Sequence, residues 1–428
     1  MWSKRKRFII MVLGAWVAVV AIACGGSATA TPIPTPTSPP PTASATSSLP
    51  SAQPAPTATP GPVANAGAPA EITFTWEIEE VDAGTKPALA LTSDGVPYVA
   101  YMLEAMPGFV KSAVRSGTSW DIATVATGYF YGPLDIAIGS DDVAHIAYHD
   151  HQDPRNFKPD KGDATYAVLQ EGEWSVSAAF DPGHDGWDNR IATDAQGRPH
   201  MSAIDPEEFG GDGVEYYHLD DSGDWVVEDI GSGPLTYKYG TSIAVDPQGN
   251  PHITYYDQRD KVLALASRHD SGWTISSVDS DGDTGLFSSL VIDQEGRFHV
   301  SYLQQTSSSS GVVKYATKGP AESTWEIRQV DTLDQLVFGF VGARNITSLT
   351  LDRQVNPWIA YSDEKKLKLA VWDGSAWRIQ IVEDAGPKTL GQLVSLKLDS
   401  RDHPHIAYFE VVNKGPLTGL VKYAKGTP

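Results

Sequence analysis

Imidazole and carboxylate groups gather in three stretches of the sequence between residues 149 and 213. They read HDHQDPRNFKPDKGDA, DPGHDGWDNR and IDPEEFGGDG. Neighbouring imidazoles and carboxylates can ligate a metal ion or exchange protons with a substrate, and an indole ring offers a flat face to a sugar. The alternative interpretation is a set of long, solvated acidic loops. The candidate ligand or metal residues are His149, Asp150, His151, Asp153, Arg155, His184, Asp185, Trp187, Asp188 and Arg190, with Asp205, Glu207 and Glu208 beside them.

A second set of histidines recurs at one position of a repeated motif, as in PHMSA, PHITY and PHIAY. Its members are His145, His200, His252, His299 and His405, and Tyr98 and Trp358 take the same position in two further copies. A metal ligand or an acid–base group would not be exchanged for Tyr or Trp. We therefore expect these rings to pack between sheets, with an N–H or O–H bonded to a backbone carbonyl. The Asp of the turn before the motif is expected to bond its own backbone two positions ahead.

The stretch DSDGDTG places Asp279, Asp281 and Asp283 at the two-residue spacing that calcium-binding loops use. An EF-hand would also need a further Gly, a distant Glu and flanking helices, and these are missing from the sequence. The stretch therefore predicts either a small Ca²⁺ loop or a polar turn. No other cofactor is indicated.

A repeat of about 50 residues must position these groups. One unit reads SIAVD, PHITYY, KVLALASR and WTISSVD, four alternating segments that are separated by turn residues. This pattern predicts four antiparallel strands, here called a, b, c and d, which is the size of a propeller blade. The Trp that opens strand d occurs seven times, as Trp76, Trp120, Trp174, Trp225, Trp273, Trp325 and Trp377.

The two ends of the repeat complement each other. TWEIEEVD is a d-type strand that stands alone before the first a strand, and GLVKYAKG is a c-type strand with no Trp strand after it. Together they would complete one blade and remove two open sheet edges. We therefore predict an all-β fold, a seven-bladed β-propeller over residues 71–428 whose N-terminal strand closes the last blade. An open β-solenoid or two smaller sandwiches would leave the split repeat unexplained.

The c–d turns carry a family likeness. They read DDSGDW, HDSGW and WDGSAW, each with Asp, Gly and Trp in order. The repeat thus resembles the sialidase-like, Asp-box (BNR) propeller superfamily, whose turn reads Ser-x-Asp-x-Gly-x-x-Trp, although here the spacing is shortened and the Ser is displaced or lost. The resemblance covers residues 72–428 and implies architecture more than activity.

A sialidase mechanism would require an arginine triad, a Tyr–Glu pair and an acidic Asp, as the resemblance implies. Arg155, Arg190, Arg259 and Arg344 fall on the predicted loop face, but the family's early Phe-Arg-Ile-Pro motif is missing and the triad cannot be matched residue by residue. Polysaccharide lyases also use seven-bladed propellers, with His, Tyr and Arg as working groups. A carbohydrate-active enzyme, either a lyase or a glycoside hydrolase, therefore stays as the alternative function.

The N-terminus is a targeting segment. Lys4, Arg5, Lys6 and Arg7 precede an apolar stretch from Phe8 to Val20, which is short for a membrane span. AIAC follows, and the segment resembles a bacterial lipoprotein signal in which Cys24 would be lipidated after cleavage. Cys24 is the only cysteine, which excludes an intramolecular disulfide. An ordinary cleaved signal and an N-terminal membrane anchor are the alternatives, and all three place the rest of the chain outside the cytoplasm.

Residues 24–70 form the predicted linker, rich in Thr, Pro, Ala and Ser, which cannot bury a core. As an extended tether it would reach on the order of 100 Å. Removing the signal peptide, residues 1–23, takes away four positive charges and changes the net charge from −21 to −25. So acidic a chain repels nucleic acid.

The sequence thus predicts an extracytoplasmic propeller that is held to a bacterial membrane by a lipid anchor. The near-uniform repeat favours a non-catalytic binding module for a glycan or a protein over an enzyme.

Overall fold

Strands make up all the regular secondary structure in the described part of the chain. The computed structural model describes residues 73–151, 162–179, 186–206, 211–233, 235, 239–334, 336, 346–391, 393–414 and 417–428. These residues belong to the second of the two units into which the chain divides, Met1–Gly67 and Ala68–Pro428. None of them forms a helix of the length and apolarity that a membrane crossing would need. Cys24 and the predicted linker lie outside the described residues.

Six sheets of four antiparallel strands follow one another in chain order, each with its strands paired in sequence. Blade 1 is β2 (Thr85–Leu91), β3 (Pro97–Leu103), β4 (Gly108–Ser116) and β5 (Ser119–Gly128), and blade 2 is β6 (Phe130–Ile138), β7 (Ala144–Asp150), β8 (Asp163–Gln170) and β9 (Glu173–Ala178). Blade 3 is β10 (Trp187–Thr193), β11 (Pro199–Asp205), β12 (Gly213–Leu219) and β13 (Trp225–Asp229), and blade 4 is β14 (Thr241–Val245), β15 (Pro251–Asp257), β16 (Val262–His269) and β17 (Gly272–Asp279). Blade 5 is β18 (Asp283–Ile292), β19 (Phe298–Gln305), β20 (Gly311–Lys318) and β21 (Glu326–Leu333), and blade 6 is β22 (Thr347–Leu351), β23 (Pro357–Ser362), β24 (Lys366–Trp372) and β25 (Trp377–Asp384).

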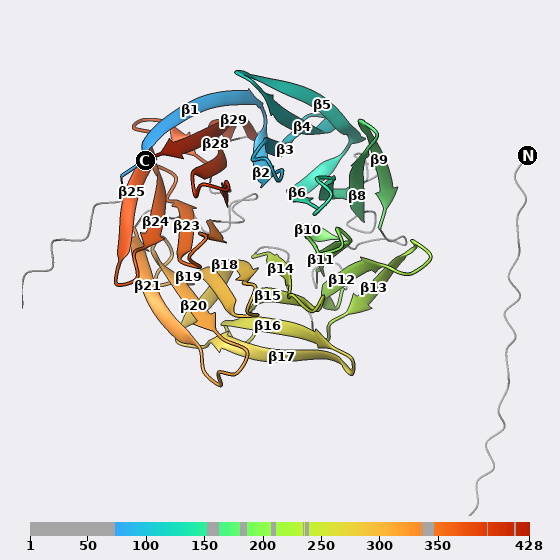
Figure 1. Cartoon of the computed structure of the whole chain (residues 1–428), viewed down its shortest axis with the longest axis vertical. Coiled ribbons are helices and arrows are strands. Elements are labelled where there is room, and N and C mark those ends of the chain that lie inside the picture. Colours follow the sequence, from blue (N-terminus) through green and yellow to red (C-terminus); the bar gives the residue numbers. More distant parts are fainter. Residues whose placement is uncertain are drawn as a thin grey trace, which may run out of the picture. The chain divides into compact units, whose positions relative to one another are not determined.

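The seventh sheet joins the two ends of the propeller. It contains β26 (Thr389–Leu390), β27 (Ser395–Leu398), β28 (Pro404–Lys414) and β29 (Leu417–Thr427), and its outer strand is β1 (Thr75–Ala83). β1 runs antiparallel to β29, with Trp76 opposite Gly426 and Glu79 opposite Tyr423. Figure 1 shows the seven blades arranged in a ring, with β1 and β29 side by side. The predicted seven-bladed propeller and its closure by the N-terminal strand are confirmed.

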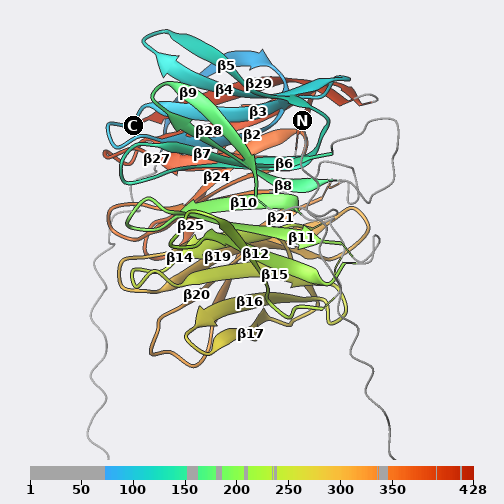
Figure 2. The ribbon, with the colours of Figure 1, turned by 90° about the vertical axis from the view of Figure 1, so that its right-hand side faces the viewer.

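The strand order within a blade runs from the axis outward. The first strand of each blade lines the centre of the ring and the last lies at the rim (Figure 1). Hairpins between the first and second strands therefore lie at one end of the propeller, and the loops that follow the second and fourth strands lie at the other. We call these ends the hairpin face and the loop face, and Figure 2 shows the blades from the side.

The repeated Trp contributes to packing between blades. Trp120 of blade 1 meets Tyr423 of blade 7 edge-on at 5.2 Å between ring centroids, and Trp273 of blade 4 meets Tyr216 of blade 3 at 5.3 Å. Edge-to-face pairs of this kind stabilise by about 0.5–1.5 kcal/mol beyond the area that they bury. The same contact recurs between Trp225 and Tyr166 and between Trp377 and Tyr315.

Candidate functional site

The histidines of the second strands lie in the interior of the blades. In blade 5, Nδ1 of His299 lies 2.6 Å from the hydroxyl of Tyr315, and Nε2 lies 3.3 Å from a carboxylate oxygen of Asp293. Asp293 in turn accepts the backbone N–H of Glu295, two positions ahead, as expected for the turn Asp. The histidines are buried, as expected for rings that pack between sheets, but their partners are side chains and not backbone carbonyls. Equivalent Tyr–His contacts join His145 to Tyr166, His200 to Tyr216 and His405 to Tyr423.

Burial keeps these imidazoles neutral. The pKa of His299 is lowered because burial disfavours the charged ring, although Asp293 opposes the effect. Burial, with a smaller contribution from Lys425, lowers the pKa of His405 to about 4. A neutral ring can accept the Tyr O–H at Nδ1 and donate Nε2–H to the carboxylate. The repeated Asp–His–Tyr arrangement is therefore part of the fold.

The loop-face end of blade 2 brings together two of the candidate histidines. His149 is the second-last residue of β7 and is fully buried, and its ring centroid lies 4.7 Å from that of Trp187, the first residue of β10. His151 is also buried, with its ring centroid 6.1 Å from that of His149. Asp150 is half-buried, and burial raises the pKa of its carboxyl despite a hydrogen bond from the backbone of Tyr129.

Blade 3 supplies an ion pair next to these rings. Asp188 and Arg190 are buried, and an Asp188 carboxylate oxygen lies 2.6 Å from Nη2 of Arg190. Nε of Arg190 donates to the backbone carbonyl of Thr241 in blade 4 at 3.2 Å. Asp188 has φ of +57°, a conformation that costs a non-glycine residue energy and persists only where the surroundings hold it. The ion pair lies within blade 3, and the Arg190 hydrogen bond to Thr241 connects blade 3 to blade 4.

The remaining candidates of the predicted loop cluster lie outside the described residues. They are Asp153, Arg155, His184 and Asp185, together with Glu207 and Glu208. Of the described members, His149, His151 and Trp187 lie on two neighbouring blades at the loop face, whereas Asp188 and Arg190 are buried in β10 and Arg190 faces the centre of the ring. The His149 ring contacts those of His151 and Trp187, and Asp188 pairs with Arg190.

Two carboxylates of the predicted calcium loop bind Tyr and Lys side chains. Asp279 Oδ2 accepts the hydroxyl of Tyr302 at 2.7 Å and the ammonium of Lys314 at 3.0 Å. Asp283 accepts the hydroxyl of Tyr256 at 2.7 Å, and its other oxygen lies 3.1 Å from Nζ of Lys261. Among the described residues, no group of three or more His, Cys, Asp or Glu side chains is placed to hold a metal ion. Ca²⁺ binding at Asp279, Asp281 and Asp283 stays a prediction.

The contacts of Asp279 belong to a repeated arrangement that the sequence analysis missed, here called the Tyr–carboxylate–Lys clasp. In each copy a Tyr and a Lys on paired strands of one blade bind a carboxylate on the last strand of the preceding blade, six residues after its Trp. Burial raises the pKa of Asp279, but hydrogen bonds from Asp281, Tyr302 and Lys314 outweigh it and hold that pKa below its usual value. The other clasps join Asp82 to Tyr101 and Lys111, Asp331 to Tyr361 and Lys368, and Glu383 to Tyr408 and Lys422.

The clasp is missing from three consecutive interfaces. In blades 2, 3 and 4 the residue opposite the Tyr position is Thr165, Glu215 or Ala264 in place of Lys. The position six residues after the Trp in the preceding blade is Ala126, Phe180 or Gly231 in place of a carboxylate. Lysine and carboxylate are thus lost together. These interfaces belong to the same side of the propeller as the loop cluster.

A cavity of about 590 Å³ lies along the axis of the ring. The first strands of all seven blades line it. In each blade one equivalent residue faces the cavity. This residue lies ten positions before the His, Tyr or Trp of the second strand. Four of these positions are serines, and each serine links neighbouring blades: Ser289 Oγ accepts the backbone N–H of Leu349 in blade 6 at 3.1 Å. The set is Ala88, Asp135, Arg190, Ser242, Ser289, Ser348 and Ser395.

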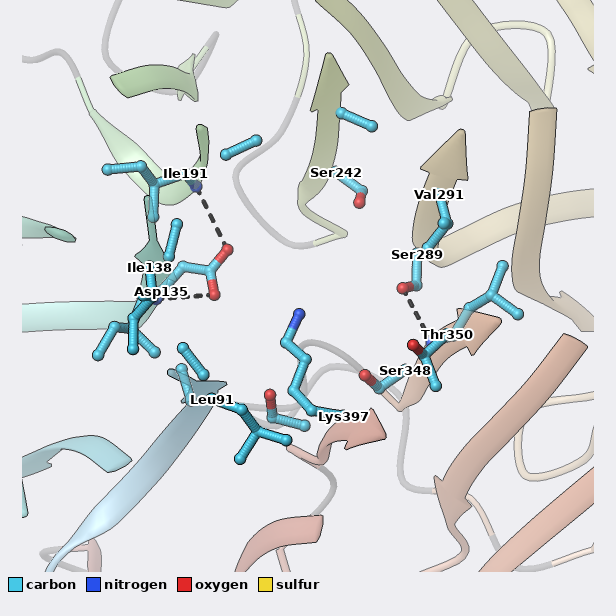
Figure 3. A pocket seen from close by; sticks show the side chains of 18 of the residues that line it. Leu91, Asp135, Ile138, Ile191, Ser242, Ser289, Val291, Ser348, Thr350 and Lys397 are labelled. Atoms are coloured by element: carbon cyan, nitrogen blue, oxygen red, sulfur yellow. Dashed lines mark hydrogen bonds between the residues drawn. The ribbon is translucent and has the colours of Figure 1, made fainter. Parts of the chain in front are cut away.

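Asp135 and Lys397 are the charged side chains that Figure 3 labels in this cavity. Asp135 accepts the backbone N–H of Ile136 at 2.9 Å and that of Ile191 at 3.3 Å. Burial raises the pKa of Asp135, and the positive charges of Arg190 and Lys397 partly offset this. Lys397 projects from β27 into the opening (Figure 3). Lys397 is not among the predicted site residues, because a lone Lys in a strand carries no signal until the seven first strands are aligned.

Comparisons with known proteins find similar solved structures at low sequence identity. No family model matches the chain, and no curated protein does. AofleA from Arthrobotrys oligospora is 13% identical, with 75% of this chain and 93% of that chain covered and a TM-score of 0.47. The α-L-arabinofuranosidase Arb93A from Fusarium graminearum is also 13% identical, with 69% and 92% covered and a TM-score of 0.47. The NanB sialidase from Streptococcus pneumoniae is 10% identical, with 80% and 68% covered and a TM-score of 0.43. A sialidase and an α-L-arabinofuranosidase are thus among the solved structures to which this chain is similar.

Proposed function

We propose that this chain is a non-catalytic binding module, displayed outside the cytoplasm on a lipid-anchored tether, which recognises a glycan or a protein. The observation that carries this proposal is that the described candidate histidines contact other side chains of the fold and are buried. His149 and His151 are buried in contact with each other or with Trp187, and the second-strand histidines bind Tyr and Asp side chains within their own blades.

The carboxylates that line the axial cavity support the same proposal. They are Asp135 and Asp399, and each accepts backbone N–H groups, Asp399 from Arg401 at 2.8 Å and His403 at 2.9 Å. A glycoside hydrolase needs an acid and a second carboxylate on either side of the scissile bond. Carboxylates that hold turns and strands in place are suited to building a rigid binding scaffold.

The experiment compares binding with turnover on the same ligands. The chain from Ala68 onward contains all seven blades and the closing strand β1, so it can be purified without the tether. It would be incubated with a panel of polysaccharides and surface proteins, and retention on each would be measured beside the release of reducing ends and unsaturated sugars. Retention without new products supports the binding module. Catalytic release of either product would contradict it and favour the carbohydrate-active enzyme.

A further inference from the structure

Three serines of the axial cavity have hydroxyl groups that can donate hydrogen bonds to a ligand. Ser242, Ser289 and Ser348 each accept a backbone N–H of the next blade, at 3.0, 3.1 and 3.0 Å respectively. A hydroxyl has one donor besides its acceptor lone pairs. Within the described residues no acceptor is recorded for the protons of these three hydroxyls, whereas Ser395 Oγ lies 3.5 Å from the carbonyl of Leu89. The interblade contacts thus fix the three oxygens and leave their O–H groups available to the cavity.

Lys397 adds a positive charge to the same wall. Two residues after the serine position, the other six blades have Ala90, Ala137, Ala192, Ala244, Val291 and Thr350, which are all short. The Lys397 side chain is exposed to the cavity, and no described residue forms a recorded hydrogen bond or ion pair with its ammonium. In Figure 3 Lys397 reaches into the opening that Ser242, Ser289 and Ser348 border.

The carboxylates of the cavity wall, Asp135 and Asp399, are held by backbone N–H groups. Both oxygens of Asp135 already accept backbone N–H groups, and it influences Lys397 through charge without a recorded direct contact. This side of the wall therefore offers one ammonium and three hydroxyl donors. Such a donor set fits the oxygens of an anion, because charge-assisted hydrogen bonds are the stronger kind.

The size and the opening of the cavity limit the ligand. About 590 Å³ is within the range of small-molecule sites and far exceeds what a bare inorganic ion fills. The lining includes Thr92, Ser93, Asp399 and Ser400, which belong to hairpins between first and second strands. The cavity thus extends towards the hairpin face, at the opposite end of the propeller from the loop cluster.

We propose that the axial cavity binds a small organic carboxylate, with the Lys397 ammonium and the hydroxyls of Ser242, Ser289 and Ser348 as its donors. This inference rests on the proposed binding function and adds to it a second site with its own ligand class. A polymer recognised at the loop face and a carboxylate in the axial cavity would bind independently.

The test is calorimetric titration of the chain from Ala68 onward with citrate, glucuronate and neutral glucose. We expect at least one carboxylate to bind and glucose not to bind. Lys397→Met should weaken carboxylate binding at least tenfold, and Lys397→Arg should retain part of the affinity because it keeps the charge. Lys366→Met removes a positive charge on β24, outside the cavity lining, and should leave the affinity unchanged.

Thermal unfolding without ligand shows whether a variant is folded. Lys397 forms no described hydrogen bond or ion pair and acts on Asp135 through charge alone, so Lys397→Met should remain folded with only a small decrease in unfolding temperature. Failure of both carboxylates to bind the folded parent would overturn the inference. So would equal affinity in Lys397→Met and Lys366→Met. Retention of a polysaccharide or protein that does not depend on Lys397 would leave the proposed function standing whichever result is obtained.

Discussion

At the scale of single residues, the second-strand histidines show how a reactive side chain becomes a structural one. His405 has 1% of its surface exposed, with Asp399 on one side and Tyr423 on the other. Its neighbours accommodate the neutral ring, and proton binding would place a charge where water cannot reach it. The same holds for His145, His200, His252 and His299, whose pKa values burial also lowers. The fold therefore depends on these rings being uncharged.

The neutral histidines predict that the free energy of unfolding decreases at a pH above the range in which carboxylates titrate. The pKa of His405 is near 6.5 in the unfolded chain and about 4 in the folded protein, so between these values the unfolded chain binds the extra proton. Stability should be constant above pH 6.5 and fall as the pH drops towards 4, by on the order of 2 kcal/mol at pH 5 from His405 alone. Urea unfolding at pH 7 and pH 5 measures the difference.

His405→Gln should make that difference smaller, because the variant has no ring to protonate. The matched control is His269→Gln on β16, where the side chain is exposed, and this variant should keep the parent's pH dependence. Equal pH dependence for the parent and His405→Gln would show that the neutral ring is not what the fold requires.

At the scale of the strands, the Tyr–carboxylate–Lys clasp predicts that Lys314 contributes far more to the free energy of unfolding than Lys366, which lies outside any clasp. Asp279 has 2% of its side chain exposed and Lys314 12%, so Lys314→Met would leave a buried carboxylate without its counter-charge. Breaking a buried pair in this way typically costs 3–5 kcal/mol, and the bonds from Tyr302 and Thr284 to Asp279 should reduce the loss to about 2 kcal/mol.

Lys366→Met is the control, because Lys366 lies 3.9 Å from Asp384 and both side chains are largely exposed. It should cost less than about 0.5 kcal/mol. The double variant Asp279→Leu with Lys314→Met should be more stable than Lys314→Met alone, since no buried charge is left. Urea unfolding of the three variants measures this. A Lys314→Met protein as stable as Lys366→Met would contradict the interpretation of the clasp.

The strands also show what could be predicted from the sequence. Alternating apolar residues, Asp-rich turns and a recurring Trp predict the number of blades, and the orphan segment at Trp76 predicts the closing strand. The clasps escaped notice because Tyr302, Lys314 and Asp279 become neighbours only when two blades pack and the register of β19 against β20 is known. Contacts among His149, Trp187 and Arg190 likewise depend on how long loops fold, which strand periodicity does not determine.

At the scale of the whole molecule, the interfaces between blades are of two kinds. Clasps connect blades 4 to 5, 5 to 6, 6 to 7 and 7 to 1, whereas the interfaces from blade 1 to blade 4 have none among the described residues. The interface of blades 1 and 2 also lacks the serine contact, because Ala88 takes the serine position and Asp135 binds the N–H of its own neighbour, Ile136. Apolar packing of Val110, Ile146 and Tyr148 holds that interface, together with hydrogen bonds from Ser93 to Asp142 at 2.6 Å and from Trp174 to Ser112 at 3.2 Å. The ring closes through β1, so every blade packs against two neighbours, and an interface with fewer polar contacts does not leave a blade unsupported.

A lipid anchor at the N-terminus would determine how the propeller is displayed. The sequence around Cys24 predicts a lipidated N-terminus, and a single acyl chain binds membranes only weakly, so stable anchoring needs more than one. Cys24→Ser removes the thiol that would be acylated, and we expect this variant to leave the membrane fraction and to incorporate no labelled palmitate. The matched control, Ser27→Ala, changes a nearby hydroxyl residue that acylation does not use and should stay with the membranes. Cys24→Ser protein that stays in the membrane fraction would identify the apolar stretch from Phe8 to Val20 as the anchor. Loss of both label and membrane association would show that the acylated Cys24 holds the propeller at the membrane, with the linker of residues 24–70 between them.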